Sequence, residues 1–355
     1  MFLRNVWYAA GHSETVEFTP TSRRICDEPI MFYRTGNSSI SALHDRCPHR
    51  FVPLSAGKVE GDVVQCGYHG LRFDQSGQCV LNPHGPIFPQ LRVRSYPVVE
   101  RYGLMWIWMG DADKADAALI PDFSPVCDEA SLRIIRGYTH VNANYELISD
   151  NLLDLSHVEY LHPDFARREG FGNFKSEMAR DGNTITAYLW KPNSPITAFQ
   201  RMLWDTTAER ADSHVHMRWD PPSLLYLDTG VTECGAPVNA GASFPSAHFL
   251  TPETATTSHY FWVLGRNVKR DDAKLHARLV EVGNRIFSTE DKPMIERQQS
   301  ALGCATDLLA QEPAILPVDK AGLRARRLLK LLIKNEQGAL TERSPEPTTC
   351  QSDRT

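Results

Sequence analysis

The sequence predicts an α+β protein: an N-terminal all-β domain followed by an α+β domain in which an antiparallel sheet has flanking helices. Three observations support this prediction. Residues 1–110 hold short runs of β-branched and aromatic residues, and Gly, Pro, Asn and Asp interrupt these runs at short intervals. Residues 145–162 have the apolar spacing of a helix. Beyond them, strand-like and helix-like segments follow one another; the strands are expected at 183–190, 214–229 and 244–267, and the helices at 271–290 and 319–336.

The length of 355 residues is enough for two domains, each with its own core. The Asp- and Ala-rich stretch DADKADAALIPDF is a candidate connector between them. We therefore place the first domain at residues 1–115 and the second at 116–337. Residues 338–355 are polar and contain proline, which predicts a disordered tail.

Composition argues against several classes of protein. Charged residues make up 23% of the chain and the net charge is −5, so no basic excess points to nucleic acid. The first residues lack the apolar core of a secretory signal, and no apolar run is long enough to span a membrane. Six of the eight cysteines are scattered singly, as expected in a reducing compartment. We therefore expect a cytoplasmic protein with no membrane association.

Two cysteine–histidine pairs form the pattern C-x-H-x16-C-x2-H, made by Cys47 and His49, then Cys66 and His69. Thiolate and imidazole ligands suit zinc or an iron–sulfur cluster rather than calcium or magnesium. A zinc site is one interpretation. The other is a Rieske [2Fe–2S] centre, in which two cysteines hold one iron and two histidines hold the other. Because each loop supplies one cysteine and one histidine, the spacing favours the Rieske centre.

A second group of potential ligands lies in DNLLDLSHVEYLHPD, residues 150–164. Asp154 and His157 are three residues apart and share a helix face. His162 is five residues after His157, so the two rings would diverge on a regular helix, but the following proline disfavours helical geometry at His162. Two histidines and one carboxylate would form the triad of non-haem Fe(II) oxygenases. Glu290 or Asp291 could supply the carboxylate.

These motifs together resemble the Rieske non-haem iron oxygenases, most closely the oxygenase components of vanillate and dicamba O-demethylase. The similar segments are CPHR, CGYHG with LRFD, DNLLDLSHVEYLH, FSTEDKPMIE, TPETATTSHYFWVLGRN and AGLRARRLLKLL, so the resemblance covers nearly the whole chain. It implies an N-terminal Rieske domain and a catalytic domain with a curved antiparallel sheet. It assigns Cys47, His49, Cys66 and His69 to the cluster, and His157, His162 and Asp291, rather than Glu290, to a mononuclear Fe(II). Pro293, close after Asp291, departs from the family pattern.

The resemblance also implies an assembly and a reaction. Asp154 would accept hydrogen bonds from an iron-binding histidine and from His69 of a neighbouring subunit in a homotrimer. A flavin/[2Fe–2S] reductase or a ferredoxin would supply electrons, and O2 would be the co-substrate. The expected reaction is O-demethylation of a methoxylated aromatic acid such as vanillate, with release of formaldehyde.

Contacts to such a substrate are the least defined part of the site. His248 and Asn151 are our candidates for hydrogen bonds to a small aromatic substrate, and Asp228 and Arg266 are weaker ones. Hydroxylation or N-demethylation of another aromatic compound is an alternative activity. An electron carrier that has only the Rieske centre is an alternative of a different class.

Overall fold

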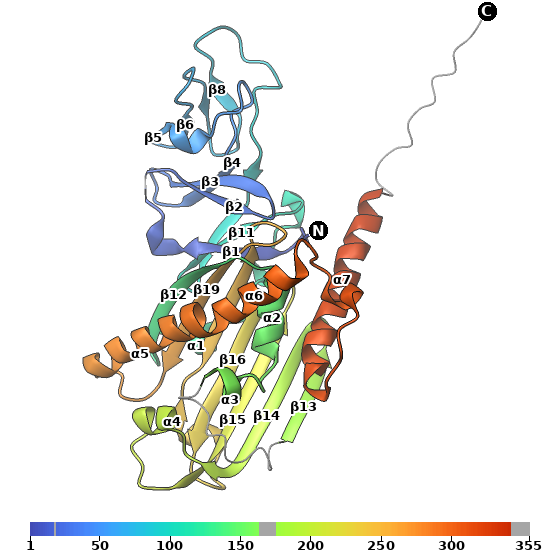
Figure 1. The fold of residues 1–355 in the computed structure, drawn as a ribbon. Coiled ribbons are helices and arrows are strands. Elements are labelled where there is room, and N and C mark those ends of the chain that lie inside the picture. Colours follow the sequence, from blue (N-terminus) through green and yellow to red (C-terminus); the bar gives the residue numbers. More distant parts are fainter. Residues whose placement is uncertain (18, 163–174, 342–355) are drawn as a thin grey trace, which may run out of the picture.

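The computed structural model describes residues 1–17, 19–162 and 175–341. The N-terminal part of the chain folds into three small antiparallel sheets, stacked above the larger part of the molecule (Figure 1). The first sheet has the order β1-β11-β10, the second β2-β3-β4-β9 and the third β5-β6-β7-β8. The strands are β1 (Trp7–His12), β2 (Thr21–Ile25), β3 (Glu28–Arg34), β4 (Ile40–His44), β5 (Lys58–Glu60), β6 (Val63–Gln65), β7 (Arg72–Phe73), β8 (Cys79–Leu81), β9 (Ser95–Tyr96), β10 (Val98–Arg101) and β11 (Leu104–Trp108).

The rest of the chain is built on one eight-stranded antiparallel sheet. Its order is β12-β19-β18-β16-β15-β14-β13, and the short β17 pairs with β16. The strands are β12 (Arg133–Val141), β13 (Lys175–Asp181), β14 (Thr184–Pro195), β15 (Arg210–Asp220), β16 (Leu224–Thr232), β17 (Ala242–Ser243), β18 (Ser246–Pro252) and β19 (Ser258–Arg266).

Helices α2, α5 and α6 cover one face of this sheet, and α7 runs along it beside β14 (Figure 1). A π-helical segment, η7, joins α5 directly to α6. The helices are α1 (Ser124–Cys127), α2 (Tyr145–Leu153), α3 (Val158–Leu161), α4 (Ala198–Leu203), α5 (Ala273–Arg285), η7 (Ile286–Asp291), α6 (Lys292–Leu302) and α7 (Lys320–Thr341). Among the described residues, no helix is long and apolar enough to cross a membrane.

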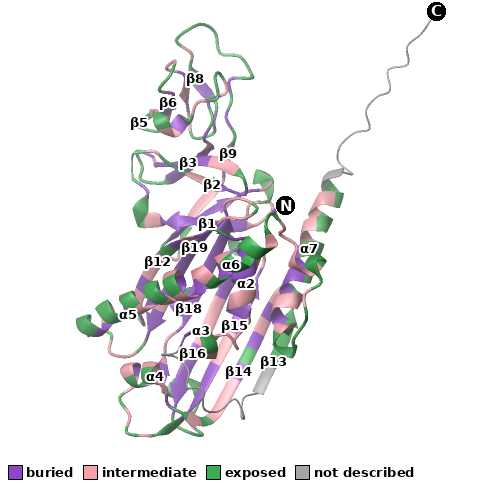
Figure 2. Ribbon diagram, viewed as in Figure 1, coloured by how far each residue is buried: buried purple, intermediate pink, exposed green. Residues whose placement is uncertain are grey.

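Alternate side chains of β18 and β19 point to opposite faces of the sheet and pack against the helices on one face and the small sheets on the other. On the helix side, Leu250, Tyr260 and Trp262 join the largest buried cluster. On the other side, Phe249 and Phe261 pack with tryptophans of the small sheets, among them Trp106. The interior is correspondingly buried through the centre of the sheet, while the loops of the small sheets are exposed (Figure 2). The β1-β11-β10 sheet is therefore packed against the face of the large sheet opposite the helix side.

The predicted α+β architecture is confirmed, with differences in detail. The segments at 214–229 and 244–267, which were expected to form strands, each contain a chain reversal, because β15 ends at Asp220 and β18 ends at Pro252. Strands β12 and β13 were not predicted from the sequence. The last helix continues to Thr341, inside the expected tail, and the remainder of that tail lies outside the described residues.

Candidate active site and metal centres

The first candidate site lies at the tip of the small sheets, where two loops of the same design face one another. In the first loop, Cys47 N–H donates to the Val52 carbonyl, and Phe51 N–H donates to the Cys47 carbonyl. In the second, Cys66 N–H donates to the carbonyl of Leu71, and Gly70 N–H donates to the Cys66 carbonyl. In each loop the main chain of the cysteine makes both hydrogen bonds, and these bonds fix the position of the histidine that follows it.

These loops bring the four predicted cluster residues together. Cys47 and Cys66 are both 1% exposed, whereas the rings of His49 and His69 lie nearer the surface, with centroids 4.4 Å apart. Burial and the adjacent Cys66 raise the pKa of the Cys47 thiol to about 11. Two thiolates side by side therefore need a cationic centre to offset their charge. Buried sulfur on one side and outer imidazole on the other fit a Rieske cluster.

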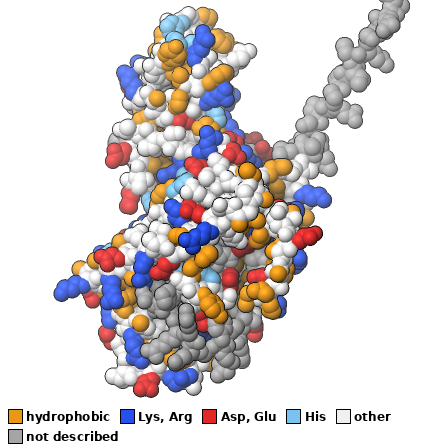
Figure 3. Space-filling view, in the orientation of Figure 1, with side chains coloured by type: hydrophobic (Ala, Val, Ile, Leu, Met, Phe, Trp, Pro, Cys, Tyr) orange, Lys and Arg blue, Asp and Glu red, His pale blue; other side chains and the backbone are white. Residues whose placement is uncertain are grey.

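Hydrophobic and basic side chains surround these histidines. Phe51 and Tyr68 are more than half exposed, and the Arg46 guanidinium lies 4.0 Å from the centre of the Phe51 ring. The space-filling view shows histidine and hydrophobic atoms together at the tip, with Lys and Arg around them (Figure 3). Exposed apolar side chains at a redox tip indicate a surface that another protein covers.

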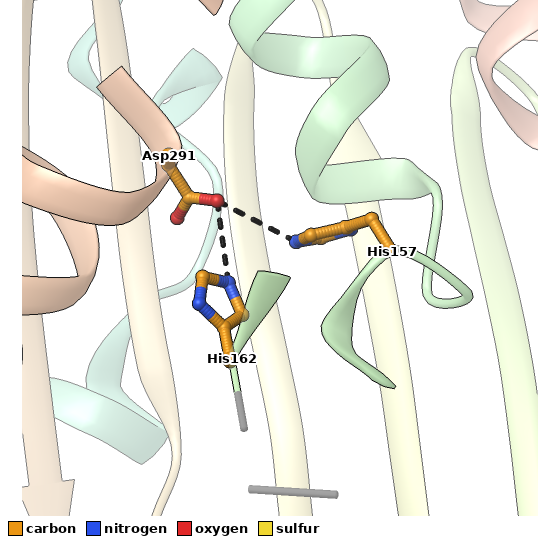
Figure 4. A group of neighbouring side chains, drawn as sticks. All are labelled: His157, His162 and Asp291. Atoms are coloured by element: carbon orange, nitrogen blue, oxygen red, sulfur yellow. Dashed lines mark ion pairs between the residues drawn. The ribbon is translucent and has the colours of Figure 1, made fainter. Parts of the chain in front are cut away.

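The second candidate site gathers His157, His162 and Asp291 on the helix-covered side of the sheet (Figure 4). The Asp291 Oδ1 atom lies 3.7 Å from His157 Nε2 and 3.2 Å from His162 Nε2. One ligand atom from each residue lies within 4.8 Å of the other two. Asp291 and His162 are buried and His157 is half-buried. Two imidazole nitrogens and one carboxylate oxygen, converging from one side, fit Fe(II) with open positions.

A break in the helix brings the two histidines together. α2 ends at Leu153, and the Asp154 carboxylate accepts hydrogen bonds from the N–H and hydroxyl of Ser156, at 2.9 and 2.6 Å. α3 then ends at Leu161, and the next residue, His162, has a φ of −119° and a ψ of 78°, which lie outside the helical region, as its following proline predicts. The ring centroids of His157 and His162 are consequently only 5.3 Å apart.

Asp154 differs from its expected role at one contact. The Nδ1–H group of His157 donates to the main-chain carbonyl of Asp154, not to its carboxylate. The carboxylate turns instead to Ser156, which caps the turn between α2 and α3. Within one chain, Asp154 therefore orients His157 through its backbone.

The acidic ligand comes from the π-helical segment. Asp291 is the last residue of η7, and Pro293 follows in the first turn of α6. Proline has no N–H for the carbonyl four residues before it, so it suits the point where one helical hydrogen-bonding pattern gives way to another. The departure at Pro293 leaves Asp291 in place, facing both histidines.

A cavity of about 300 Å³ opens beside the triad. Its walls are mostly apolar and come from the inner face of the sheet and from α5, with Leu189, Met217, Leu227, Phe244, Leu264, Leu279 and Phe287 among the lining residues. Pockets of this size and lining bind small organic ligands.

The predicted substrate contacts have separate outcomes. His248 lines the cavity, but its ring nitrogens already contact the Tyr260 hydroxyl at 2.7 Å and the Ser246 hydroxyl at 2.9 Å. Burial lowers its pKa to about 3, so the ring is neutral. The Asn151 amide lies 3.4 Å from Asp291 Oδ1 and therefore supports the carboxylate.

The two weaker candidates differ from each other. The Asp228 carboxylate lies 3.3 Å from His214 Nε2, and Asp228 is not among the residues that line the cavity. Arg266 does line it, and its Nη2 donates to main-chain carbonyls, including that of Lys269 at 3.1 Å. Neither residue contacts the triad in the described structure.

One polar pair on the cavity wall, Lys191 and Glu159, was not predicted from the sequence. The Lys191 Nζ atom lies 3.3 Å from Glu159 Oε1, and both residues line the cavity. The Glu159 Oε2 atom is buried and has no hydrogen-bond partner among the described residues. Glu159 lies two residues after His157, which marks it as close to the metal site, but nothing in the sequence pairs it with a lysine 32 residues away.

Both parts of the chain match known protein families. Residues 6–97 match the Rieske [2Fe-2S] domain family, and residues 141–335 match the vanillate O-demethylase oxygenase C-terminal domain family. The chain is 36% identical to the oxygenase component of dicamba O-demethylase from Stenotrophomonas maltophilia, over 93% of this chain and 98% of that protein. It is 35% identical to the oxygenase component of chloroacetanilide N-alkylformylase from Rhizorhabdus wittichii, over 95% and 97%. A crystal structure of dicamba monooxygenase bound to 3,6-dichlorosalicylic acid superposes with a TM-score of 0.87, at 36% identity and 95% and 99% coverage.

Proposed function

Because the chain belongs to the family of Rieske-type oxygenase components that share the vanillate O-demethylase oxygenase C-terminal domain, we propose that it demethylates a methoxylated aromatic acid such as vanillate. As the oxygenase component of a monooxygenase, it takes electrons from a separate reductase or ferredoxin. The observation that carries the proposal is the mostly apolar cavity with the two-histidine, one-carboxylate group on its wall.

Different residues would hold the cluster, hold the iron and position the substrate. Cys47, His49, Cys66 and His69 would hold the Rieske cluster, and His157, His162 and Asp291 would hold the Fe(II). The iron, when bound, supplies activation of O2 for insertion of one oxygen into a methyl C–H bond. The apolar walls position the ring and exclude water from the reacting carbon. Oxidation of a methoxy carbon gives a hemiacetal, which separates into a phenol and formaldehyde.

Lys191 is the cation that best fits the acidic group of such a substrate. Arg133, Lys191 and Arg266 all line the cavity. Arg266 is the last residue of β19, and its Nη2 donates to the Lys269 carbonyl at 3.1 Å. Arg133 is paired beside it in register. Lys191 instead contacts Glu159, which neighbours the iron-binding histidines, so it is within reach of a benzoate placed at the triad.

The test is a substrate panel. Purified protein, a reductase and NADH are supplied with vanillate and other methoxybenzoates, and formaldehyde and the phenol product are measured. We expect stoichiometric formaldehyde from at least one methoxybenzoate and much less from its methyl ester, which lacks the anionic group. Release of formaldehyde from none of the acids, together with turnover of an N-methyl or ring-methyl compound, would replace O-demethylation by one of the alternative activities.

We also propose a homotrimer in which His69 of one subunit approaches Asp154 of the next. The tip of the small sheets, at β5, β6 and β8, extends beyond the end of the large sheet, with α3 toward the opposite end of the molecule (Figure 1), and apolar side chains at the tip are exposed. Mixed oligomers test this arrangement. A His69→Ala chain and a His157→Ala chain, each inactive alone, should regain activity when refolded together, because some interfaces then join an intact cluster to an intact triad. No recovery in mixed oligomers of verified composition would refute the arrangement.

A further inference from the structure

Two consecutive acidic residues, Glu290 and Asp291, each contact one ring nitrogen of His162. The Nε2 atom faces Asp291 Oδ1 at 3.2 Å, and the Nδ1 atom lies 2.7 Å from Glu290 Oε2. Since a carboxylate only accepts, Nδ1 carries the proton in this hydrogen bond. The bond therefore leaves Nε2 as the nitrogen that turns toward the other two ligand atoms.

Glu290 is held in this position from its other side. The Arg285 Nε atom lies 3.3 Å from Glu290 Oε1, and Arg285 precedes Glu290 by five residues, one turn of the π-helical segment. The Glu290 side chain is 18% exposed and that of His162 is 6% exposed, so little water competes for the hydrogen bond. The π-helix thus presents Asp291 to one nitrogen of the ring and Glu290 to the other.

The other iron-binding histidine has no such partner. His157 Nδ1 donates to the neutral main-chain carbonyl of Asp154. Of the two Nδ1 atoms, only that of His162 contacts a carboxylate within the described residues. A carboxylate on the far nitrogen of a metal-binding histidine fixes its tautomer and tilt and makes the ring a stronger donor to the metal.

We propose that Glu290 is a positioning residue of the mononuclear iron centre, acting through His162 to strengthen iron binding. This inference rests on the metal assignment within the proposed function. Glu290 is not itself a ligand, because its oxygen lies on the Nδ1 side of His162, whereas the three ligand atoms converge on the Nε2 side.

The test compares iron retention in the complete protein. Glu290→Ala removes the acceptor, and Glu290→Gln keeps an oxygen acceptor without the charge. Glu253→Gln is the matched control, because Glu253 contacts His140 Nε2 at 2.6 Å in an equivalent carboxylate–imidazole pair outside the cavity. Each variant is loaded with Fe(II) and challenged with a chelator, and iron loss is followed while the visible spectrum of the Rieske cluster reports that the fold is intact. Binding of Co(II) to the triad, followed by its visible absorption, is a second readout that needs no turnover.

We expect Glu290→Ala to bind the metal about 10–100-fold more weakly. Glu290→Gln should recover part of this loss, and Glu253→Gln should match the wild type. Wild-type retention in both Glu290 variants would overturn the inference, as would equal losses in Glu253→Gln. A wild-type protein that holds the metal but releases no formaldehyde from any methoxybenzoate would refute the proposed substrate, while weaker metal binding in the Glu290 variants would still support the role of Glu290.

Discussion

Burial of His248 should lower the free energy of unfolding of the protein in mild acid, because burial lowers the pKa of its ring. The ring is 2% exposed, and burial lowers its pKa from an ordinary value of about 6.5 to about 3. Between these two values the unfolded chain binds a proton that the folded protein excludes. The free energy of unfolding therefore falls as the pH falls through this window, and the contribution of His248 between about pH 7 and pH 5 is a loss of about 2 kcal/mol.

The measurement is a urea titration at both pH values for the wild type and for His248→Gln, whose side chain does not titrate. The variant should lose about 2 kcal/mol less stability than the wild type on acidification. His259 is the matched control, because burial lowers its pKa to about 4 and its Nε2 donates to the Arg24 carbonyl, outside the cavity. His259→Gln should reduce the pH dependence by a similar amount.

The effect of each variant on KM should distinguish His248 from His259. His248→Gln should raise KM for the aromatic acid, because His248 lines the cavity, whereas His259→Gln should leave KM unchanged. Identical pH dependence of stability in the wild type and His248→Gln would show that the ring is not held neutral by burial, and the reasoning would fail.

Three further predictions concern the metal site, the substrate and the packing behind the cavity. His157→Ala should keep the visible spectrum of the Rieske cluster but abolish product formation; turnover by this variant would refute the mononuclear site. Lys191→Met should raise KM for an aromatic acid about tenfold or more, since a charge-assisted hydrogen bond is lost, and should change KM for the methyl ester little; an equal effect on both compounds would argue against Lys191 as the anchor. Gly137→Ala would place a Cβ 1.9 Å from the Trp262 ring, so it should destabilise the protein by about 1–3 kcal/mol, measurable as a lower thermal midpoint; an unchanged midpoint would mean that Trp262 repacks without strain.

Sequence patterns predicted residues best where the chemistry is local. The two cysteine–histidine pairs each lie within one short loop, so spacing alone indicated four ligands for one site. The two histidines of the triad were also local, at five residues apart. Asp291 was chosen over Glu290 only through resemblance, because neighbouring carboxylates have the same ligand chemistry. The structure separates them by the nitrogen of His162 that each one faces.

Contacts across the sheet could not be predicted in the same way. Lys191 meets Glu159 because β14 passes beneath α3, and this depends on the pairing of strands that the sequence reading left unresolved. Similarly, the sequence did not show which groups His248 contacts, because only Ser246 among its partners lies nearby in the chain. One partner, Tyr260, lies on the adjacent strand β19.

The metal site forms where helices lose their regular geometry. On a regular α-helix, His157 and His162 would point about 140° apart, but α2 ends at Leu153 and α3 is a separate turn, so their rings meet. Likewise, consecutive carboxylates would diverge by about 100° from an α-helix, but η7 brings both to opposite sides of one imidazole ring. Two interrupted helical segments, opposite one another, bring the ligand atoms together here, which is why helical periodicity located the helices but not the geometry of the site.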